Sequence, residues 1–177
     1  MFEIKQLNPE KYRQQTRRST VTIALLFVLL GMLLSSVAVM LFGEPGGDNF
    51  RWNLAGIIVG LLLTVALVRL KFWHQPWMAP AVYGWQLKRR LMSITNVMHH
   101  VTAGVTAQDP MAIKLLRFYH LGLTQMHQLD GNSSALSQMV AEINQHKEAM
   151  EALGMNTEQN QMNPAWLVAV KKANAAR

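Results

Sequence analysis

The chain has 177 residues, of which half are hydrophobic and only 15% are charged, whereas about 25% of the residues of a typical soluble domain are charged. The length allows one ordinary domain. The chain contains no cysteine, which excludes disulfides, thiolate-bound zinc, iron–sulfur clusters and a cysteine nucleophile.

Two apolar stretches predict membrane-spanning helices. Residues 20–42 contain no charge, and at 1.5 Å per residue they are long enough to cross a hydrocarbon core of about 30 Å. Residues 52–73 have an uncharged centre that is extended by Trp52 and by basic and aromatic residues, which can lie at the membrane interface. The alternative for the first stretch is a cleaved signal peptide, but the apolar part of such a peptide has only about 7–15 residues.

The short segment 43–51 is rich in Gly and Pro, so it predicts an external loop that joins the two spans into an antiparallel hairpin. Small residues recur at a spacing of four in each span. This pattern is typical of close helix packing in lipid, either inside one hairpin or between two copies. The predicted helix-packing residues are Gly31 and Ser35 in the first span, and Gly56, Gly60 and Thr64 in the second.

Basic residues flank both spans on the same side. Residues 1–19 and 69–90 are basic, whereas the loop has more acidic than basic residues. The positive-inside rule therefore places the N-terminus and the C-terminal region in the cytoplasm. Anionic lipid headgroups also attract such residues, so we expect a bilayer with anionic headgroups as a partner and no nucleic acid.

The stretch RLKFWHQPWMAPAVYGWQLKRR, residues 69–90, mixes aromatic and basic side chains. Aromatic residues with basic neighbours gather at the membrane–water interface, and Pro76 and Pro80 interrupt helical hydrogen bonding. The sequence thus predicts an interfacial elbow over 74–90. The residues predicted to lie at the interface are Trp52, Arg69, Lys71, Phe72, Trp73, Trp77, Tyr83, Trp85, Lys88, Arg89 and Arg90.

The rest of the chain, residues 91–177, predicts a cytoplasmic helical domain. An apolar stripe with heptad spacing predicts one helix over 87–105. The second helix begins at Asp109-Pro110 and stops near Asp130-Gly131, the third is capped by Ser133 or Ser134, and Asn163-Pro164 starts a short last helix after a flexible linker. No strand is predicted. The predicted fold class is all-α: an integral membrane helical hairpin of two transmembrane helices plus a cytoplasmic antiparallel bundle of three to four helices.

Histidines are the only candidates for metal chemistry, because imidazole binds zinc and other transition metals. The candidates are His99, His100, His120, His127 and His146. They form no His-x-x-x-His pair on one helix face and no HExxH motif, so structural roles are favoured over a metal site. No catalytic residue and no cofactor is predicted.

Three stretches carry a resemblance: EIKQLNPEKYRQQTRRS near the N-terminus, the two spans, and FWHQPWMAPAVYGWQLKRRLMSITNVMHH after them. Together they resemble an uncharacterised family of small two-span bacterial inner-membrane proteins. The resemblance covers nearly the whole chain. It implies a bacterial inner membrane and supports the predicted topology, but it implies no ligand, activity or catalytic residue.

Three functional hypotheses follow. The first is a non-catalytic accessory or scaffold protein of the inner membrane, whose helical domain binds a second copy or another inner-membrane protein. The alternative is a small oligomeric, tension-gated channel built around the stripe Gly56, Gly60 and Thr64. The third is a membrane protein that binds a metal through its histidines.

Overall fold

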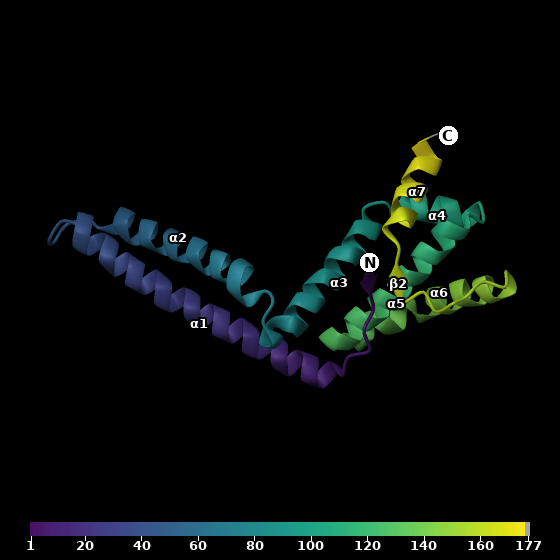
Figure 1. Cartoon of the computed structure of the whole chain (residues 1–177), viewed down its shortest axis with the longest axis horizontal. Helices are drawn as coiled ribbons and strands as arrows, with labels where there is room; N and C mark the ends of the chain where they lie inside the picture. The colour runs from purple at the N-terminus through teal and green to yellow at the C-terminus, as the bar shows by residue number, and fades with distance from the viewer. Residues whose placement is uncertain (176–177) are drawn as a thin grey trace. The chain divides into compact units, whose positions relative to one another are not determined.

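The computed structural model describes residues 1–175, and these residues are helical apart from short connections and one pair of two-residue strands (Figure 1). The described residues therefore have the all-α fold that the sequence predicts. They divide into two compact units. The span unit comprises residues 14–82, and the helical unit comprises residues 1–13 together with the chain from residue 83 onward.

The span unit contains most of helix α1, Pro9–Phe42, and all of helix α2, Phe50–Leu67. A π-helix, η1, continues α2 over Val68–Phe72, and a 3-10 helix, η2, covers Pro76–Met78. The helix Pro9–Phe42 and the combined helix Phe50–Phe72 are each long and apolar enough to cross a membrane. Figure 1 shows α1 and α2 side by side.

Helix α1 begins well before the predicted span. The side-chain oxygen of Asn8 accepts hydrogen bonds from the backbone N–H groups of Glu10 and Lys11, each at 3.0 Å, and so caps the helix. Pro9 occupies the first helical position, where its missing N–H is not needed. Much of the basic segment 1–19 is therefore helical, because the cap and not the hydropathy determines where the helix starts.

The helical unit contains five α-helices among the described residues. They are α3 Ala79–Thr95, which begins in the span unit, α4 Met98–Thr106, α5 Pro110–Asp130, α6 Ser133–Ala152 and α7 Pro164–Ala175. Helix α5 is central, since it packs against α4, α6 and α7 and has more buried residues than any other helix described. Leu115 and Phe118 of α5 are fully buried in this core.

The single helix predicted over 87–105 is in fact two helices. A turn at Asn96 and Val97 separates α3 from α4, and Val97 has φ −127° and ψ 21°, which is not helical. Ile94 and Val101 are nevertheless both fully buried in one core. The apolar spacing continues across the turn, so periodicity alone does not reveal the break.

The predicted ends of α5 are confirmed. The Asp109 side chain accepts a hydrogen bond from the Met111 N–H at 2.9 Å, and Pro110 occupies the first turn. Gly131 ends the helix with φ +73°, a left-handed conformation in which glycine carries no Cβ penalty. The cap of α6 was predicted wrongly: it is Asn132, whose side chain accepts from the Ala135 N–H at 3.2 Å, and not Ser133 or Ser134.

The two short strands correct the prediction for both ends of the chain. Strand β1, Phe2–Glu3, pairs with β2, Gln161–Met162, and the Ile4 N–H donates to the Asn160 carbonyl at 2.8 Å. Ile4 and Met162 are buried in the core. The segment predicted as a flexible linker therefore contains a strand, and the N-terminal residues belong to the helical unit. Neither feature has a local sequence signal, since each strand has only two residues and its partner is distant in the chain.

Candidate functional site

The small residues of α1 and α2 face each other within the chain. A Cβ atom added to Gly56 would overlap the backbone of Ser35, and one added to Gly60 would lie 2.8 Å from the Cα of Gly31. The Ser35 hydroxyl donates to the Asn53 side-chain oxygen at 2.7 Å. Residues later in α2 therefore contact residues earlier in α1, so the two helices are antiparallel and their backbones approach closely.

Two further contacts complete this helix pair. The Thr64 hydroxyl is buried and donates to the Gly60 carbonyl at 2.8 Å, so its polar group is satisfied inside its own helix. At the end next to the connecting turn, the rings of Phe42 and Trp52 stack with centroids 5.0 Å apart. Small residues thus line the contact, and an aromatic pair closes it at one end.

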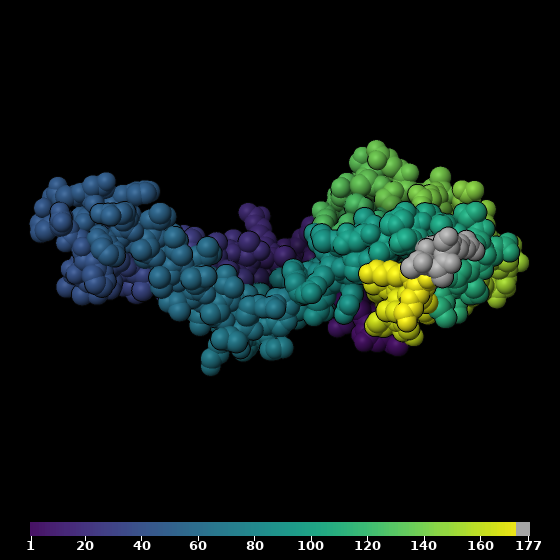
Figure 2. All heavy atoms as spheres, turned by 90° about the horizontal axis from the view of Figure 1, so that it is seen from above, coloured from purple at the N-terminus to yellow at the C-terminus, as the bar shows by residue number. Residues whose placement is uncertain are grey.

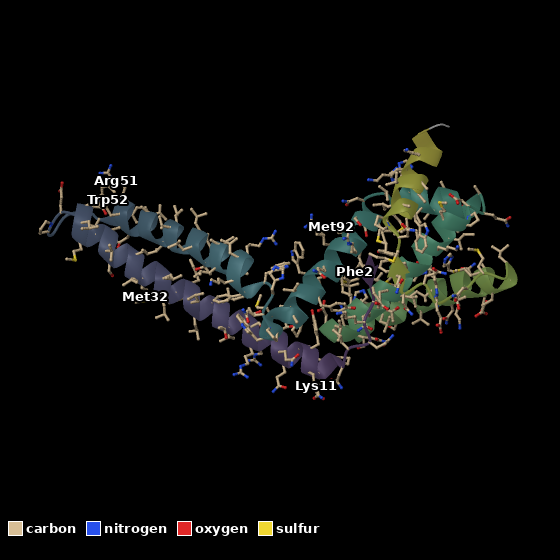
Figure 3. All side chains as sticks on the ribbon, in the orientation of Figure 1. Phe2, Lys11, Met32, Arg51, Trp52 and Met92 are labelled. Atoms are coloured by element: carbon tan, nitrogen blue, oxygen red, sulfur yellow. The ribbon has the colours of Figure 1, made fainter. Side chains whose placement is uncertain are left out.

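The remaining faces of α1 and α2 are apolar and uncovered. Only 6% of the most apolar part of α1 and 17% of that of α2 and η1 is buried inside the chain. Met32 projects from α1 on the side away from α2 (Figure 3), and the outer surface of α2 faces the viewer in Figure 2. Leu29 and Leu62 are among the exposed leucines. Such an area of apolar surface marks a site that another phase or molecule covers.

Basic and aromatic residues lie at the end of the span unit away from the turn. The Ser19 hydroxyl donates to the Trp77 carbonyl at 2.8 Å and so joins α1 to η2. The Arg69 guanidinium lies 4.8 Å from the centre of the Trp73 ring, and the Phe72 and Trp77 rings are 5.4 Å apart. Lys71 is exposed on η1. The predicted interface residues of this segment are therefore together.

Two of the residues predicted at the interface make contacts inside the helical unit. Tyr83 is only 7% exposed, and its hydroxyl accepts a hydrogen bond from the Lys5 N–H at 3.0 Å. Burial raises the pKa of Tyr83, and the Lys5 N–H opposes this rise. Lys88 forms an ion pair with Asp130 at 2.9 Å. Tyr83 faces the core because it precedes the buried Leu87 by one helical turn, and composition alone did not distinguish it from the exposed aromatics.

The other predicted residues of α3 are exposed. Trp85 and Arg90 lie at the surface, and the Arg89 guanidinium is 5.0 Å from the centre of the Trp85 ring. Met92 projects from α3 (Figure 3) and is 63% exposed. The sequence alone does not place Met92 at the surface, because methionine also fills gaps in cores.

The candidate histidines form two pairs. The rings of His120 on α5 and His146 on α6 are 5.2 Å apart and meet edge to face, and the rings of His99 and His100 are 3.8 Å apart. His127 lies near the end of α5, away from both pairs in sequence. Within residues 1–175, no group of three or more His, Cys, Asp and Glu side chains is arranged to hold a metal ion.

The pair His120 and His146 belongs to a buried polar cluster with Arg117. Arg117 donates from Nε to the Thr157 carbonyl at 2.8 Å, and a His146 nitrogen lies 3.1 Å from the Ile113 carbonyl oxygen. Within residues 1–175, Nη1 of Arg117 and both ring nitrogens of His120 are buried without a hydrogen-bond partner, although Nε2 of His120 lies 3.5 Å from a carboxylate oxygen of Glu142. The cluster thus lies where α5 meets α6 and the segment before β2.

Burial keeps the imidazoles of this cluster neutral. Burial, together with the neighbouring His146, lowers the pKa of His120 to about 4, although Glu142, with a carboxylate oxygen 3.5 Å from His120 Nε2, has the opposite effect. Burial also lowers the pKa of His146 and of Arg117. Desolvation disfavours each charged form. Protonation of either imidazole would add a buried positive charge beside the Arg117 cation and weaken the contact between α5 and α6.

Comparison with known proteins gives a family but no relative of known function. No curated protein and no solved structure matches the chain. A family model described as protein of unknown function, DUF3087, matches residues 2–167. The match begins in β1 and ends inside α7, so it includes both units. The chain therefore belongs to the DUF3087 family.

Proposed function

We propose that this protein is a two-span protein of the bacterial inner membrane whose helical unit works by binding other proteins. The uncovered apolar surface of α1 and α2 supports the membrane anchor most directly. Burying apolar surface is favourable by about 25 cal/mol for each Å², so an aqueous environment would drive these helices to associate or aggregate. A hydrocarbon layer covers them without any further protein contact.

The chain segments that share the core of the helical unit support the hairpin topology independently. Ile4, before α1, and Met162, after α6, lie in one core, so both belong on the same side of a membrane. The chain between them must then cross the membrane an even number of times. Two crossings, one by α1 and one by α2 with η1, meet this requirement.

Charge supports the orientation. Within the span unit, Arg17 and Arg18 precede the apolar part of α1, and Arg69 and Lys71 follow that of α2. The acidic residues of this unit lie in the connecting turn. The positive-inside rule then orients the basic end, and with it both termini, toward the cytoplasm.

Protein binding fits the helical unit better than the two other hypotheses. A pore built around Gly56, Gly60 and Thr64 would require α2 to leave α1, because these residues already contact the partner helix or bond within α2. Metal binding would require further ligands to join His120 and His146, whose surroundings include the cation Arg117. A protein-binding role requires neither the separation of α2 from α1 nor additional metal ligands. Apolar side chains such as Val140 and Val168 are exposed on the helices of this unit.

Cysteine labelling tests the topology, because the chain has no cysteine of its own. We expect Glu44→Cys in the turn to react with a membrane-impermeant maleimide on spheroplasts. Val168→Cys on α7 should react only after the membrane is opened. The reverse order would contradict the orientation, and equal labelling of both sites before opening would contradict the two-span anchor.

Photo-crosslinking in native membranes tests the binding function. A photoreactive amino acid at Val140 or Val168 should give a discrete protein adduct, whereas one at the exposed Met32 of α1 should react mainly with lipid. The mass of the complex after mild detergent extraction gives the stoichiometry. A monomer that forms no adduct from either helix would contradict the proposal.

A further inference from the structure

Helix α3 divides its side chains sharply between two faces. The inner face carries Tyr83, Leu87, Leu91 and Ile94, all of which are buried in the core of the helical unit. The outer face carries Trp85, Arg89 and Met92, which follow one another at spacings of four and three residues and are exposed. Arg90 is also exposed, but it lies about 100° around the helix from Arg89. The outer stripe of α3 is therefore defined as Trp85, Arg89 and Met92.

The stripe is positively charged. Helix α3 contains no acidic residue. Lys88, the remaining cation of the helix, is paired with Asp130 of α5. The Arg89 guanidinium lies over the Trp85 ring, so a charged group and an aromatic ring form one surface. Arg90 adds an exposed cation on the flank of the same helix.

We propose that the outer stripe of α3 binds the headgroup layer of a membrane that contains anionic lipid. This inference rests on the proposed membrane anchor and adds a second, peripheral contact to it. Each component of the stripe fits such a layer. Trp is enriched at the membrane interface, Arg is attracted to anionic headgroups, and the exposed thioether of Met92 can enter the acyl boundary as the apolar residues of interfacial helices do.

Chain continuity favours a membrane over another partner. Only residues 73–78 separate η1, the end of the apolar helix, from the start of α3. A residue extends the chain by at most about 3.6 Å, so the first turn of α3 must begin within about 25 Å of the end of η1. The linking segment contains Trp73 and Trp77, which also suit the interface. A second copy of this chain would bring another basic stripe and hence repulsion.

Lipid-depth quenching in nanodiscs tests the proposal on the full chain. Met92→Cys, the only cysteine in its variant, carries a fluorophore, and headgroup spin-labelled lipid serves as quencher. Matched labels are placed at Val168→Cys, which is exposed on α7, and at Leu61→Cys, which is exposed on α2. Discs of phosphatidylcholine with phosphatidylglycerol are compared with discs of phosphatidylcholine alone.

We expect strong headgroup quenching at residue 92 in discs with phosphatidylglycerol, weaker quenching without it or in high salt, and little quenching at residue 168. The variant Arg89→Gln should lower the ratio of docked to undocked α3 about fivefold. The matched control removes two exposed cations of α7, by Lys171→Gln with Lys172→Gln, and should leave the quenching at residue 92 unchanged.

Several outcomes would overturn the inference. Equal quenching at residues 92 and 168 in all discs would show that the stripe does not prefer the membrane. Protection of residue 92 from both lipid and aqueous quenchers would show that protein covers it, as a second copy or another partner would. The label at residue 61 distinguishes the two proposals. If a quencher in the acyl region does not reach this label, the proposed membrane anchor is wrong. If that quencher reaches residue 61 but the headgroup quencher does not reach residue 92, only the proposed headgroup contact of α3 is wrong.

Discussion

Arg117, His120 and His146 place nitrogen-rich side chains inside a helical contact where apolar residues would be usual. His120 is only 1% exposed, and neither of its ring nitrogens has a hydrogen-bond partner in the part of the chain that the structure describes. Buried polar groups without partners are costly. The cluster therefore makes the contact between α5 and α6 sensitive to the protonation of a few atoms.

Acidification should loosen this contact. The pKa of His120 is about 4 in the fold and about 6.5 in an unfolded chain. The neutral imidazole thus stabilises the fold fully above pH 6.5, and this contribution is lost as the pH falls from 6.5 toward 4. We expect a loss of about 1–2 kcal/mol between pH 7 and pH 5. Hydrogen exchange of α6 amides, corrected for the intrinsic pH dependence, measures it.

Two substitutions identify the source of this pH effect. His120→Leu should weaken the pH dependence of α6 protection over that range, because one of the two buried imidazoles is gone while His146 remains. His99→Leu, at an exposed site of α4, should keep the wild-type pH dependence. A wild-type profile in the His120 variant would refute the assignment.

The hydroxyl of Tyr83 offers a second test at the residue scale. Tyr83→Phe removes the hydrogen bond to the Lys5 N–H and keeps the ring in the core, so it should destabilise the N-terminal segment by about 1 kcal/mol. Faster exchange of the Lys5 amide would report the loss. Tyr119→Phe, on the adjacent helix α5, is the control and should leave that amide unaffected. Unchanged exchange in Tyr83→Phe would contradict a stabilising role for the bond.

Local chemistry made some residues predictable and left others ambiguous. Asp109, Pro110 and Gly131 mark the ends of α5 because capping and left-handed geometry depend on neighbours in sequence. Tyr83 and Lys88 were assigned to the interface because nothing local reveals that one faces a core and the other faces Asp130. The facing of a helix depends on tertiary packing.

At the scale of elements, the close contact between α1 and α2 depends on residues with small side chains or none. Gly60 lies so close to the Gly31 backbone that a larger residue must push the helices apart. Small residues let helix backbones approach in this way. The spacing of these glycines predicted a packing face, and the structure uses it inside the chain.

Substitution of Gly60 should separate these helices. In the background Ser35→Cys with Asn53→Cys, whose native side chains are hydrogen-bonded at 2.7 Å, we expect an intramolecular disulfide under oxidation. Gly60→Leu should lower its yield several-fold. Ala55→Leu adds similar bulk at an exposed position of α2 and should not. Equal yields in both variants would show that close approach at Gly60 does not hold the pair.

The break between α3 and α4 shows a limit of periodicity at this scale. The apolar stripe from Leu87 to Val105 keeps its spacing, although the backbone leaves the helical conformation at Val97. Burial of Ile94 and Val101 in one core requires only that both side chains point inward. A regular pattern therefore predicts which residues are buried better than it predicts a continuous helix.

For the whole molecule, the division into units could be predicted only in part. Hydropathy indicates two long apolar helices, but the N-terminal residues were assigned to a separate segment and instead belong to the helical unit. Their contacts join the two ends of the chain, and such long-range pairs leave no periodic pattern in a single sequence. Ile4 is the clearest example, since its neighbours along the chain are mostly polar.

Truncation of Ile4 should therefore weaken the whole helical unit. Ile4→Ala removes a buried side chain that lies next to Gly122, as do the side chains of Leu87 and Leu91, and we expect a loss of about 2–4 kcal/mol. Thermal unfolding of the full chain in nanodiscs, followed through exchange of α5 amides, measures the loss. Lys5→Ala, at an exposed neighbouring site, is the control. Equal stability of the two variants would place Ile4 outside the core.

The pairing of β1 with β2 has a consequence for biosynthesis. A ribosome makes residues 2–3 first, but their partners at 161–162 emerge only after both apolar helices and most of the helical unit. The N-terminal residues must then wait, unpaired, while the two apolar helices and most of the helical unit are made. The last step of maturation would be their capture by the newly made C-terminal segment. A bulky fusion at Met1 should interfere with that late capture more than the same fusion at the other end, even though neither fusion is attached to α1 or α2.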